Sequence, residues 1–313
     1  MMLSYIVRRL WQMIPTLLGV MLLLFTLYTL VGGDPSYILA GKSLSAETIA
    51  SIRTQLGLDK SLPEQFLIFV KQVLTMNFGT SWSTQQPVSE IIRTRIGPSV
   101  MLLLTWQLCS LFFSLLFAAS VAYYKGSIYD RAVTIISTVA MSISILVYII
   151  AGQYFLAYKM QWFPVYGWGN GFWQNFLLYI PLPLIIGVAV SVAPDTRFYR
   201  SCFIEEMNQD YVRTARAKGL SERKVMLKHV MRNALIPIVT GVMSSLPYMI
   251  TGSVLMERFF GIPGLGNEIL KAVNSSDFPV IKAITIYLVI AIMVFNLLAD
   301  LLYKWIDPRV KLN

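Results

Sequence analysis

The sequence is poor in charged residues, cysteine and histidine. Only 13% of its 313 residues are Asp, Glu, Lys or Arg, whereas 56% are hydrophobic and the mean hydropathy is +0.62. Because soluble domains carry about 25% charged residues, this composition argues against a water-soluble fold. The two cysteines, Cys109 and Cys202, stand in an apolar run and in a basic stretch. We therefore predict neither a disulfide framework nor a metal cluster.

Patterns for catalysis and phosphate binding are also missing. The one histidine, His229, has no partner at the spacing that a zinc site or a Ser/His/Asp triad needs. The nearest approach to a phosphate-binding loop is 40–43, but Ser36 stands where its first glycine would be. We predict that the chain is not an enzyme, has no catalytic residues, and binds no cofactor or metal. The net charge of +10 does not indicate nucleic acid, because no compact basic domain remains outside the apolar runs.

Apolar runs near the length that a membrane helix needs, about 20 residues, recur along the chain. They cover residues 10–31, 99–123, 132–158, 176–194, 235–256 and 283–302. The predicted fold class is an all-α membrane protein with about six transmembrane helices. Pro98 stands where a helix would begin, and Pro181, Pro183 and Pro194 indicate a short or kinked fourth span.

The positive charge indicates an orientation. With both termini in the cytoplasm, 16 of the 26 basic residues fall in the cytoplasmic segments, which are 1–9, 124–131, 195–234 and 303–313. This bias agrees with the positive-inside rule. Residues 32–97 are then external, and amphipathic stretches at 45–56 and 63–74 predict a small helical subdomain there. We divide the chain into 1–31, 32–97 and 98–313, the last holding five spans.

The cytoplasmic segment 195–234 contains DYVRTARAKGLSERKVMLKHVMRNALIP. Residues 211–218 favour a helix, Gly219 is a typical helix stop, and Ser221 is placed to begin a second helix. We call this helix, turn and helix the elbow. A basic elbow suits the docking of a partner, although a solvated connector fits the same pattern about equally well.

These residues closely resemble the coupling loop of ABC transporter permeases of the dipeptide and oligopeptide (and nickel) importer family, first-permease subunit. Other segments resemble the same family in the same order, among them LGLDKSLPEQ, FGTSW, PVSEIIRTRIGPS, RFFGIPGLGNEILKAV, SSDFPVIKA and DLLYKWIDPRV. The resemblance covers essentially the whole chain. It departs from the wider superfamily at Arg213 and Thr214, where relatives carry Glu and Ala of a Glu-Ala-Ala triplet, and at Arg232, where many have proline.

The resemblance implies a type I ABC importer permease fold in the bacterial inner membrane. It implies that this chain forms half of a translocation pathway for di- or oligopeptides. The implied partners are a second permease, two ATPase subunits that bind ATP and Mg, and an external substrate-binding protein. Nickel chelate, glutathione or an antimicrobial peptide are alternative substrates on the same scaffold. An ion-coupled carrier or channel is the alternative from another class, but it would not need the elbow, and few ionisable residues lie well inside the spans.

Three sets of candidate site residues follow. The resemblance assigns ATPase coupling to Arg213, Thr214, Ala215, Lys218, Gly219 and Leu220. It also assigns a re-entrant loop near an external gate to Pro263, Gly264 and Gly266, which an ordinary tight turn would also explain. Polar residues inside the spans are candidates for a wet, charge-poor pathway or for helix packing, namely Gln107, Gln153, Thr251 and Asn296, with Ser142 and Ser144.

Overall fold

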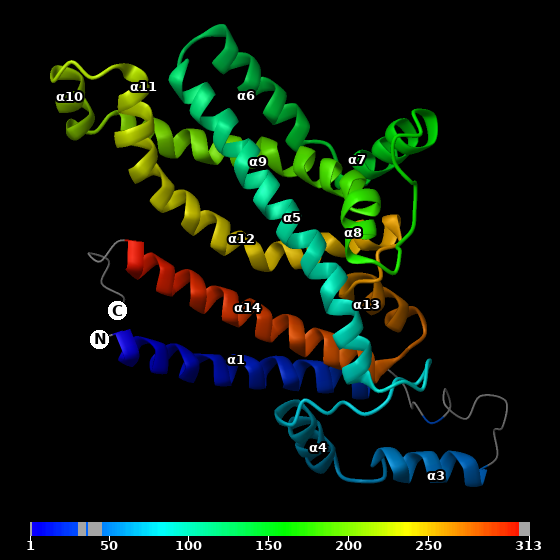
Figure 1. The fold of residues 1–313 in the computed structure, drawn as a ribbon. Coiled ribbons are helices and arrows are strands. Elements are labelled where there is room, and N and C mark those ends of the chain that lie inside the picture. The colour runs from blue at the N-terminus through cyan, green and yellow to red at the C-terminus, as the bar shows by residue number, and fades with distance from the viewer. Residues whose placement is uncertain (1, 31–35, 37–45, 307–313) are drawn as a thin grey trace. The chain divides into compact units, whose positions relative to one another are not determined.

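The computed structural model describes residues 2–30, 36 and 46–306 (Figure 1). Within these ranges the chain forms helices and turns, with one isolated bridge between Thr80 and Pro87 and no β-strand. The predicted all-α class is confirmed. The helices are α1 (Met2–Leu30), α3 (Ala46–Leu56), α4 (Leu62–Leu74), α5 (Val88–Tyr123), α6 (Ile128–Met141), α7 (Ile145–Gly152), η1 (Gln153–Lys159), α8 (Phe172–Gln174), η2 (Asn175–Tyr179), α9 (Pro181–Met207), α10 (Asp210–Ala217), α11 (Glu222–Lys224), η3 (Val225–Val230), α12 (Met231–Phe260), α13 (Leu265–Asn274) and α14 (Phe278–Ile306).

The chain packs as two compact units. The first unit comprises residues 1–97 and 267–297, and the second comprises 98–266 and 298–313. The three-part division made from the sequence has other boundaries and stays a prediction.

In the first unit, α1 packs against α4. The amphipathic stretches predicted in the external segment form α3 and α4, although the cap residue Ser45 lies outside the described residues. Ser61 begins α4, where its backbone N–H donates to Glu64 Oε2 at 3.1 Å. That bond satisfies one of the amides that a helix start leaves without an intrahelical partner.

In the second unit, α9 packs against α6, α7 and α12. Two apolar clusters form its core. One joins α5, α9, α10, η3 and α12 around Phe203, and the other joins α5, α7, α9 and α12 around Ile149 and Met256. Close helix contact at the second cluster depends on Gly187, where a Cβ would lie 2.7 Å from the Trp106 ring.

Helices α1, α5 and α14 are each long and apolar enough to cross a membrane. Two broken pairs also pass this test, since α6 meets the helix 145–159 at 93° and the helix 172–179 meets α9 at 54°. Counting each pair as one span gives up to five. The predicted span 235–256 lies in α12 and is not among these five. Several side chains of this helix are outside the described set.

Two details of the predicted spans were wrong. The run 132–158 is not one helix, because α6 ends at Met141 and α7 begins after Ser144, whose side chain accepts a hydrogen bond from the Leu146 amide at 3.4 Å. Pro98 does not start the second span, because α5 begins at Val88 and includes Pro98 in its interior. The predicted kink of the fourth span is confirmed by the 54° bend, which falls at the start of α9, just before Pro181.

Candidate functional site

The elbow has the predicted helix, turn and second helix. Helix α10 ends at Ala217, Lys218 is its C-cap, and Gly219 has a φ of +78°, in the left-handed region that glycine adopts without strain. The Gly219 amide donates to the Arg216 carbonyl at 2.9 Å and the Lys218 amide donates to the Thr214 carbonyl at 3.1 Å. These bonds satisfy carbonyls that the helix end would otherwise leave unpaired.

The second helix of the elbow is not a separate element. It begins after Ser221, whose backbone is extended but whose side chain makes no capping bond. Helix α11 then runs without interruption through the wide turns of η3 into α12. The elbow is therefore joined to α12 by continuous helical backbone.

An ion pair closes the turn between α10 and α11. Arg216 Nε lies 2.8 Å from Glu222 Oε1, and Arg216 Nη2 lies 3.2 Å from Glu222 Oε2. Such a two-point pair fixes orientation as well as distance. Because both side chains are substantially exposed, it contributes little to stability, on the order of 0.5 kcal/mol.

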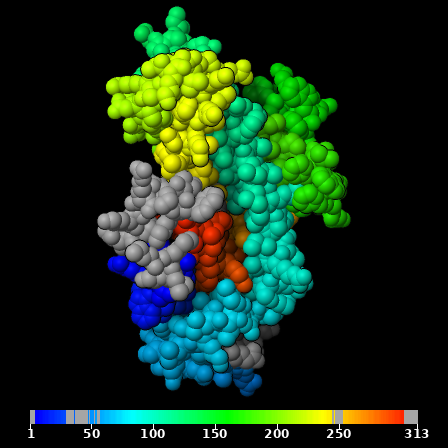
Figure 2. All heavy atoms as spheres, turned by 60° about the vertical axis from the view of Figure 1, so that its left-hand side comes forward, coloured from blue at the N-terminus to red at the C-terminus, as the bar shows by residue number. Residues whose placement is uncertain are grey.

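The elbow has a buried face and an exposed face. Val212 and Ala215 are buried against Val225 and Val230 of η3 and Phe203 of α9. Arg213, Thr214, Lys218 and Gly219 are exposed, and Leu220 is partly buried. In Figure 2 the side chains of 210–230, in yellow-green, form a continuous surface. Ala215 therefore packs inside its own subunit, which explains its small size, and only the other candidates present atoms to a partner.

A basic cavity of about 530 Å³ lies beside α10. Its walls include Lys228, His229 and Arg232, together with Tyr211 and Asn233. The Tyr211 hydroxyl donates to Glu206. Burial, reinforced by this bond, raises the pKa of Tyr211, so the phenol keeps its proton at neutral pH. The exposed elbow and this cavity together offer positive charge to a partner.

The glycine loop, residues 261–266, is built around a buried carboxylate. Glu257, on the last turn of α12, is fully buried and accepts hydrogen bonds from Ser99 Oγ at 2.7 Å and Ser253 Oγ at 3.2 Å. Ser99 Oγ in turn accepts a bond from the Leu265 amide at 2.8 Å. These bonds tie the start of α13 to α5 and α12.

Two of the predicted loop residues leave room for this carboxylate. A Cβ at Gly264 would lie 2.4 Å from the Glu257 carboxyl and from Ser99 Oγ, and a Cβ at Gly266 would lie 2.7 Å from the Val254 Cα. Glycine is needed at both positions because the backbone passes too close to its neighbours for a side chain. Pro263 lies between Gly261, with a φ of +71°, and Gly264. Sequence reasoning missed Glu257 and Ser99. Two features of the sequence could have indicated them. Glu257 is an acidic residue directly after an apolar run, and Ser99 directly follows Pro98.

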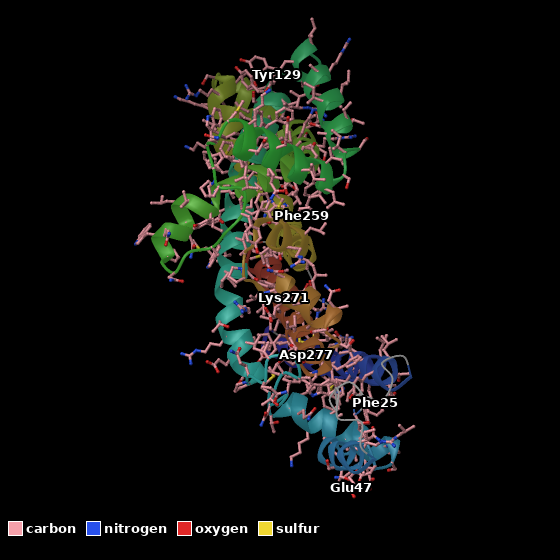
Figure 3. All side chains as sticks on the ribbon, turned by 90° about the vertical axis from the view of Figure 1, so that its right-hand side faces the viewer. Phe25, Glu47, Tyr129, Phe259, Lys271 and Asp277 are labelled. Atoms are coloured by element: carbon pink, nitrogen blue, oxygen red, sulfur yellow. The ribbon has the colours of Figure 1, made fainter. Side chains whose placement is uncertain are left out.

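A second buried carboxylate organises the first unit. Asp277, labelled in Figure 3, is 1% exposed and accepts bonds from the Ser81 and Ser83 hydroxyls and from the Trp82 and Ser83 amides. It stands immediately before α14. The segment FGTSW is thus fixed to the segment SSDFP. Both segments are among those that resemble the permease family.

The structure places the four pathway candidates in unlike surroundings. Gln107 is buried, and Gln153 donates to the backbone carbonyls of Phe259 at 2.9 Å and Val165 at 3.1 Å, which is a helix-packing role. The side chain of Thr251 lies outside the described set. Asn296 is exposed on α14, in the other unit from Gln107 and Gln153. Among the described residues, no hydrogen bond joins Gln107 to Gln153.

Family models match nearly the whole chain. Residues 110–312 match the binding-protein-dependent transport system inner membrane component, and residues 2–104 match the N-terminal part of such components. The chain belongs to this family. It is a multi-pass inner membrane protein and a permease subunit of an ABC importer.

Relatives of this permease agree in length as well as in sequence. The chain is 37% identical to the glutathione transport system permease protein GsiC of Salmonella typhimurium over 315 aligned residues, with 99% of each chain covered. It is 34% identical to the probable peptide ABC transporter permease protein y4tP of Sinorhizobium fredii, with 98% of this chain and 99% of that one covered.

The fold of the permease also has a solved counterpart. A crystal structure described as an amino acid ABC transporter with histidines matches with a TM-score of 0.52 and 14% identity, covering 69% of this chain and 94% of the other. At this identity the likeness concerns the fold alone. The predicted type I importer permease fold is consistent with it.

Proposed function

We propose that this permease forms one half of the translocation pathway for short peptides, either di- and oligopeptides or glutathione. The observation that carries the proposal is the full-length similarity to proteins named as a glutathione permease and a probable peptide permease. Both named substrates contain amide bonds and free carboxylates. A pathway for varied peptides should be wet and low in charge, which agrees with the few ionisable residues in the predicted spans. Nickel chelate and antimicrobial peptides stay as lesser alternatives.

The proposed complex contains this chain, a second homologous permease, two ATPase subunits and an external substrate-binding protein. ATP and Mg would be bound by the ATPases, and this chain would supply no catalytic residue. Both termini would lie in the cytoplasm, with the helices α3 and α4 outside. The positive-inside distribution of Lys and Arg supports this orientation.

We assign ATPase docking to the exposed face of the elbow, with Arg213, Thr214, Lys218 and Gly219 at the surface and Leu220 at its edge. Ala215 would act indirectly, by holding α10 against η3. The support is geometric, because the elbow is stiffened by the Arg216–Glu222 pair and continues into α12. A closing motion of the ATPases would thus reach the glycine loop, which follows the far end of α12.

We assign the external gate to Pro263, Gly264 and Gly266, which are held by the Glu257 and Ser99 bonds. For the pathway we keep Gln107, Thr251 and Asn296 as candidates. Gln153 is the weakest of the set, because its amide already bonds two backbone carbonyls.

Uptake by the reconstituted complex tests the proposal. The chain is co-expressed with the subunits encoded beside it, reconstituted in vesicles, and supplied with binding protein and radiolabelled peptide. We expect ATP-dependent uptake that unlabelled dipeptide, oligopeptide or glutathione inhibits. Inhibition by glutathione alone would select the glutathione alternative, whereas inhibition only by nickel chelate would contradict the proposal.

A further inference from the structure

A small cavity in the first unit encloses a lysine. The cavity has a volume of about 230 Å³ and is formed by α1, α4, the loop 77–82 and the first turns of α14. Aromatic side chains make much of its wall, among them Tyr28, Phe69 and Trp82. Phe278 packs edge to face with Tyr28 at 4.8 Å and with Trp82 at 5.8 Å between ring centroids, and the Tyr28 and Trp82 rings are tilted at 6.4 Å.

The ammonium group of Lys282 points into this aromatic wall. Its Nζ lies 3.9 Å from the centroid of the Tyr28 ring and 5.3 Å from that of Phe69. Cation–π contact of this kind partly offsets the loss of hydration. Among residues 2–30, 36 and 46–306, Lys282 forms no ion pair, and the cavity wall contains no Asp or Glu. Within these described ranges the positive charge therefore has no anionic partner.

The nearest acidic residue in sequence does not supply that anion. Asp277 is committed to four hydrogen bonds from residues 81–83. A cation held in a partly buried, aromatic cavity is costly unless a negative group joins it. The cavity wall also carries polar groups that are able to hydrogen-bond such a group, at Gln72 and Thr80.

The position of the cavity along the membrane spans indicates where the anion comes from. The parts of α1 and α14 that are long and apolar enough to cross a membrane are 5–29 and 278–301. Tyr28 is thus next to the end of one span, and Lys282 is in the first turns of the other. A residue at the end of a span is expected at the depth where lipid headgroups meet the hydrocarbon, and Tyr and Trp favour that level.

The outer face of α4 fits the same environment. Leu67 and Leu74 lie seven residues apart on this helix and are 65% and 74% exposed, and the exposed Lys71 lies between them. The opposite face buries Phe69 and Val73. An amphipathic helix with leucines and a lysine on its free face is typical of the membrane interface.

We propose that this cavity is a binding site for the phosphate of an anionic phospholipid, with Lys282 as the charge partner and the acyl chains lying along α1 and α14. Only 6% of the span in α1 is buried within the chain, so apolar surface is available there for acyl chains. Lysine is a suitable phosphate ligand because its ammonium is a compact charge with several donors. The site is distinct from the elbow and the glycine loop.

Native mass spectrometry of the full-length permease purified from membranes with its co-purifying subunits tests the proposal. The complex is delipidated in mild detergent and titrated with phosphatidylglycerol or phosphatidylcholine. We expect preferential retention of phosphatidylglycerol, and we expect Lys282→Met to weaken it about fivefold, the factor for one lysine at an anionic surface. Lys282→Arg should retain the lipid. Lys60→Met, at an exposed lysine of the same unit, should behave as the parent protein.

Equal retention by the parent and by Lys282→Met, or no preference in the parent, overturns the proposal. If the Lys282→Met protein does not accumulate, Lys282→Gln is compared with Lys282→Arg. Equal retention of phosphatidylglycerol by these two variants also overturns the proposal. A parallel titration uses inorganic phosphate and glycerol phosphate. If either competes with phosphatidylglycerol at similar concentration, the lipid is not the source of the anion and the assignment fails.

Discussion

Ser81 and Asp277 are 196 positions apart in the chain, yet the Ser81 hydroxyl donates directly to the Asp277 carboxylate. Their contact fixes the loop before α5 to the start of α14. The carboxylate is buried and also accepts from the Trp82 and Ser83 amides, so it replaces water as the acceptor for these two backbone groups.

Removing this acceptor should loosen the loop locally. In Asp277→Asn, the carboxylate that accepts from the Trp82 and Ser83 amides becomes a neutral side-chain amide. Its oxygen is a weaker acceptor, and its NH2 group cannot accept from them at all. We expect hydrogen exchange of the peptide 78–87 to accelerate at least about tenfold, because one charge-assisted bond contributes about 1.5 kcal/mol or more. Mass spectrometry of the exchanged protein measures it. Asp59→Asn, at an exposed aspartate of the same unit, serves as control, and unchanged exchange in Asp277→Asn would contradict the role of this residue.

The glycine loop offers a matched pair of alanine substitutions. In Gly264→Ala the new Cβ would lie 2.4 Å from the Glu257 carboxyl, so the loop or the carboxylate must move, at a cost of about 1–3 kcal/mol. In Gly97→Ala, within α5, the Cβ meets nothing within 4 Å, and alanine favours the helix.

We expect Gly264→Ala to lower the temperature of thermal aggregation in detergent and to reduce uptake, and Gly97→Ala to leave both unchanged or slightly raised. Thermal melting of the purified complex and vesicle uptake measure these effects. An equal response of the two variants would show that the Glu257 contacts do not constrain the loop.

The orientation is testable by labelling. In a Cys109→Ala, Cys202→Ala background, cysteines at Ser61 and Ser221 should react with a membrane-impermeant maleimide from opposite sides, because the proposed topology places the start of α4 outside and the elbow in the cytoplasm. Both positions are exposed. Intact cells should label Ser61→Cys only, and inverted vesicles Ser221→Cys only. Labelling of both from one side would refute the proposed topology.

Much of the fold was predictable because its signals are local. Run length predicted the long apolar helices α1, α5 and α14, and a glycine after a helix-forming run predicted the turn at Gly219, where φ is positive. The 93° bend between α6 and α7 was not predictable, because Ser142 and Ser144 in an apolar run are equally compatible with continued helix and with a break.

The constellations around Glu257 and Asp277 depend on partners far away in the chain. Ser99 and Glu257 are 158 positions apart, and no spacing rule links a serine to a distant glutamate. The glycines at 264 and 266 were recognised from the sequence as unusual backbone, but the carboxylate that requires them appears only when the helices pack. The same holds for Ala215, which the resemblance placed among the coupling residues and which the structure buries in the core of its own subunit.

The surroundings of Gly219 allow a specific test of coupling between the elbow and an ATPase. Gly219 is exposed, and a Cβ there would meet nothing within 4 Å, so a side chain at 219 would project away from the subunit. The intramolecular cost of substitution is mainly the positive φ, about 1–2 kcal/mol for most residues and less for asparagine. By contrast, Ala215→Glu would bury a charge in the core and destabilise the permease itself.

We therefore compare Gly219→Glu with Gly219→Asn. If an ATPase docks on this face, Gly219→Glu places a negative charge in the interface and should abolish ATP-dependent uptake and the stimulation of ATPase activity by loaded binding protein. Gly219→Asn tolerates the same backbone and should retain most of both activities. Membrane insertion of the two variants should be equal, and co-purification of the ATPase subunits should decrease only for Gly219→Glu. Uptake at the parent rate by a correctly inserted Gly219→Glu permease would show that the elbow is only a connector. If a partner covered this face, an added negative charge would be buried in the interface and would impair docking.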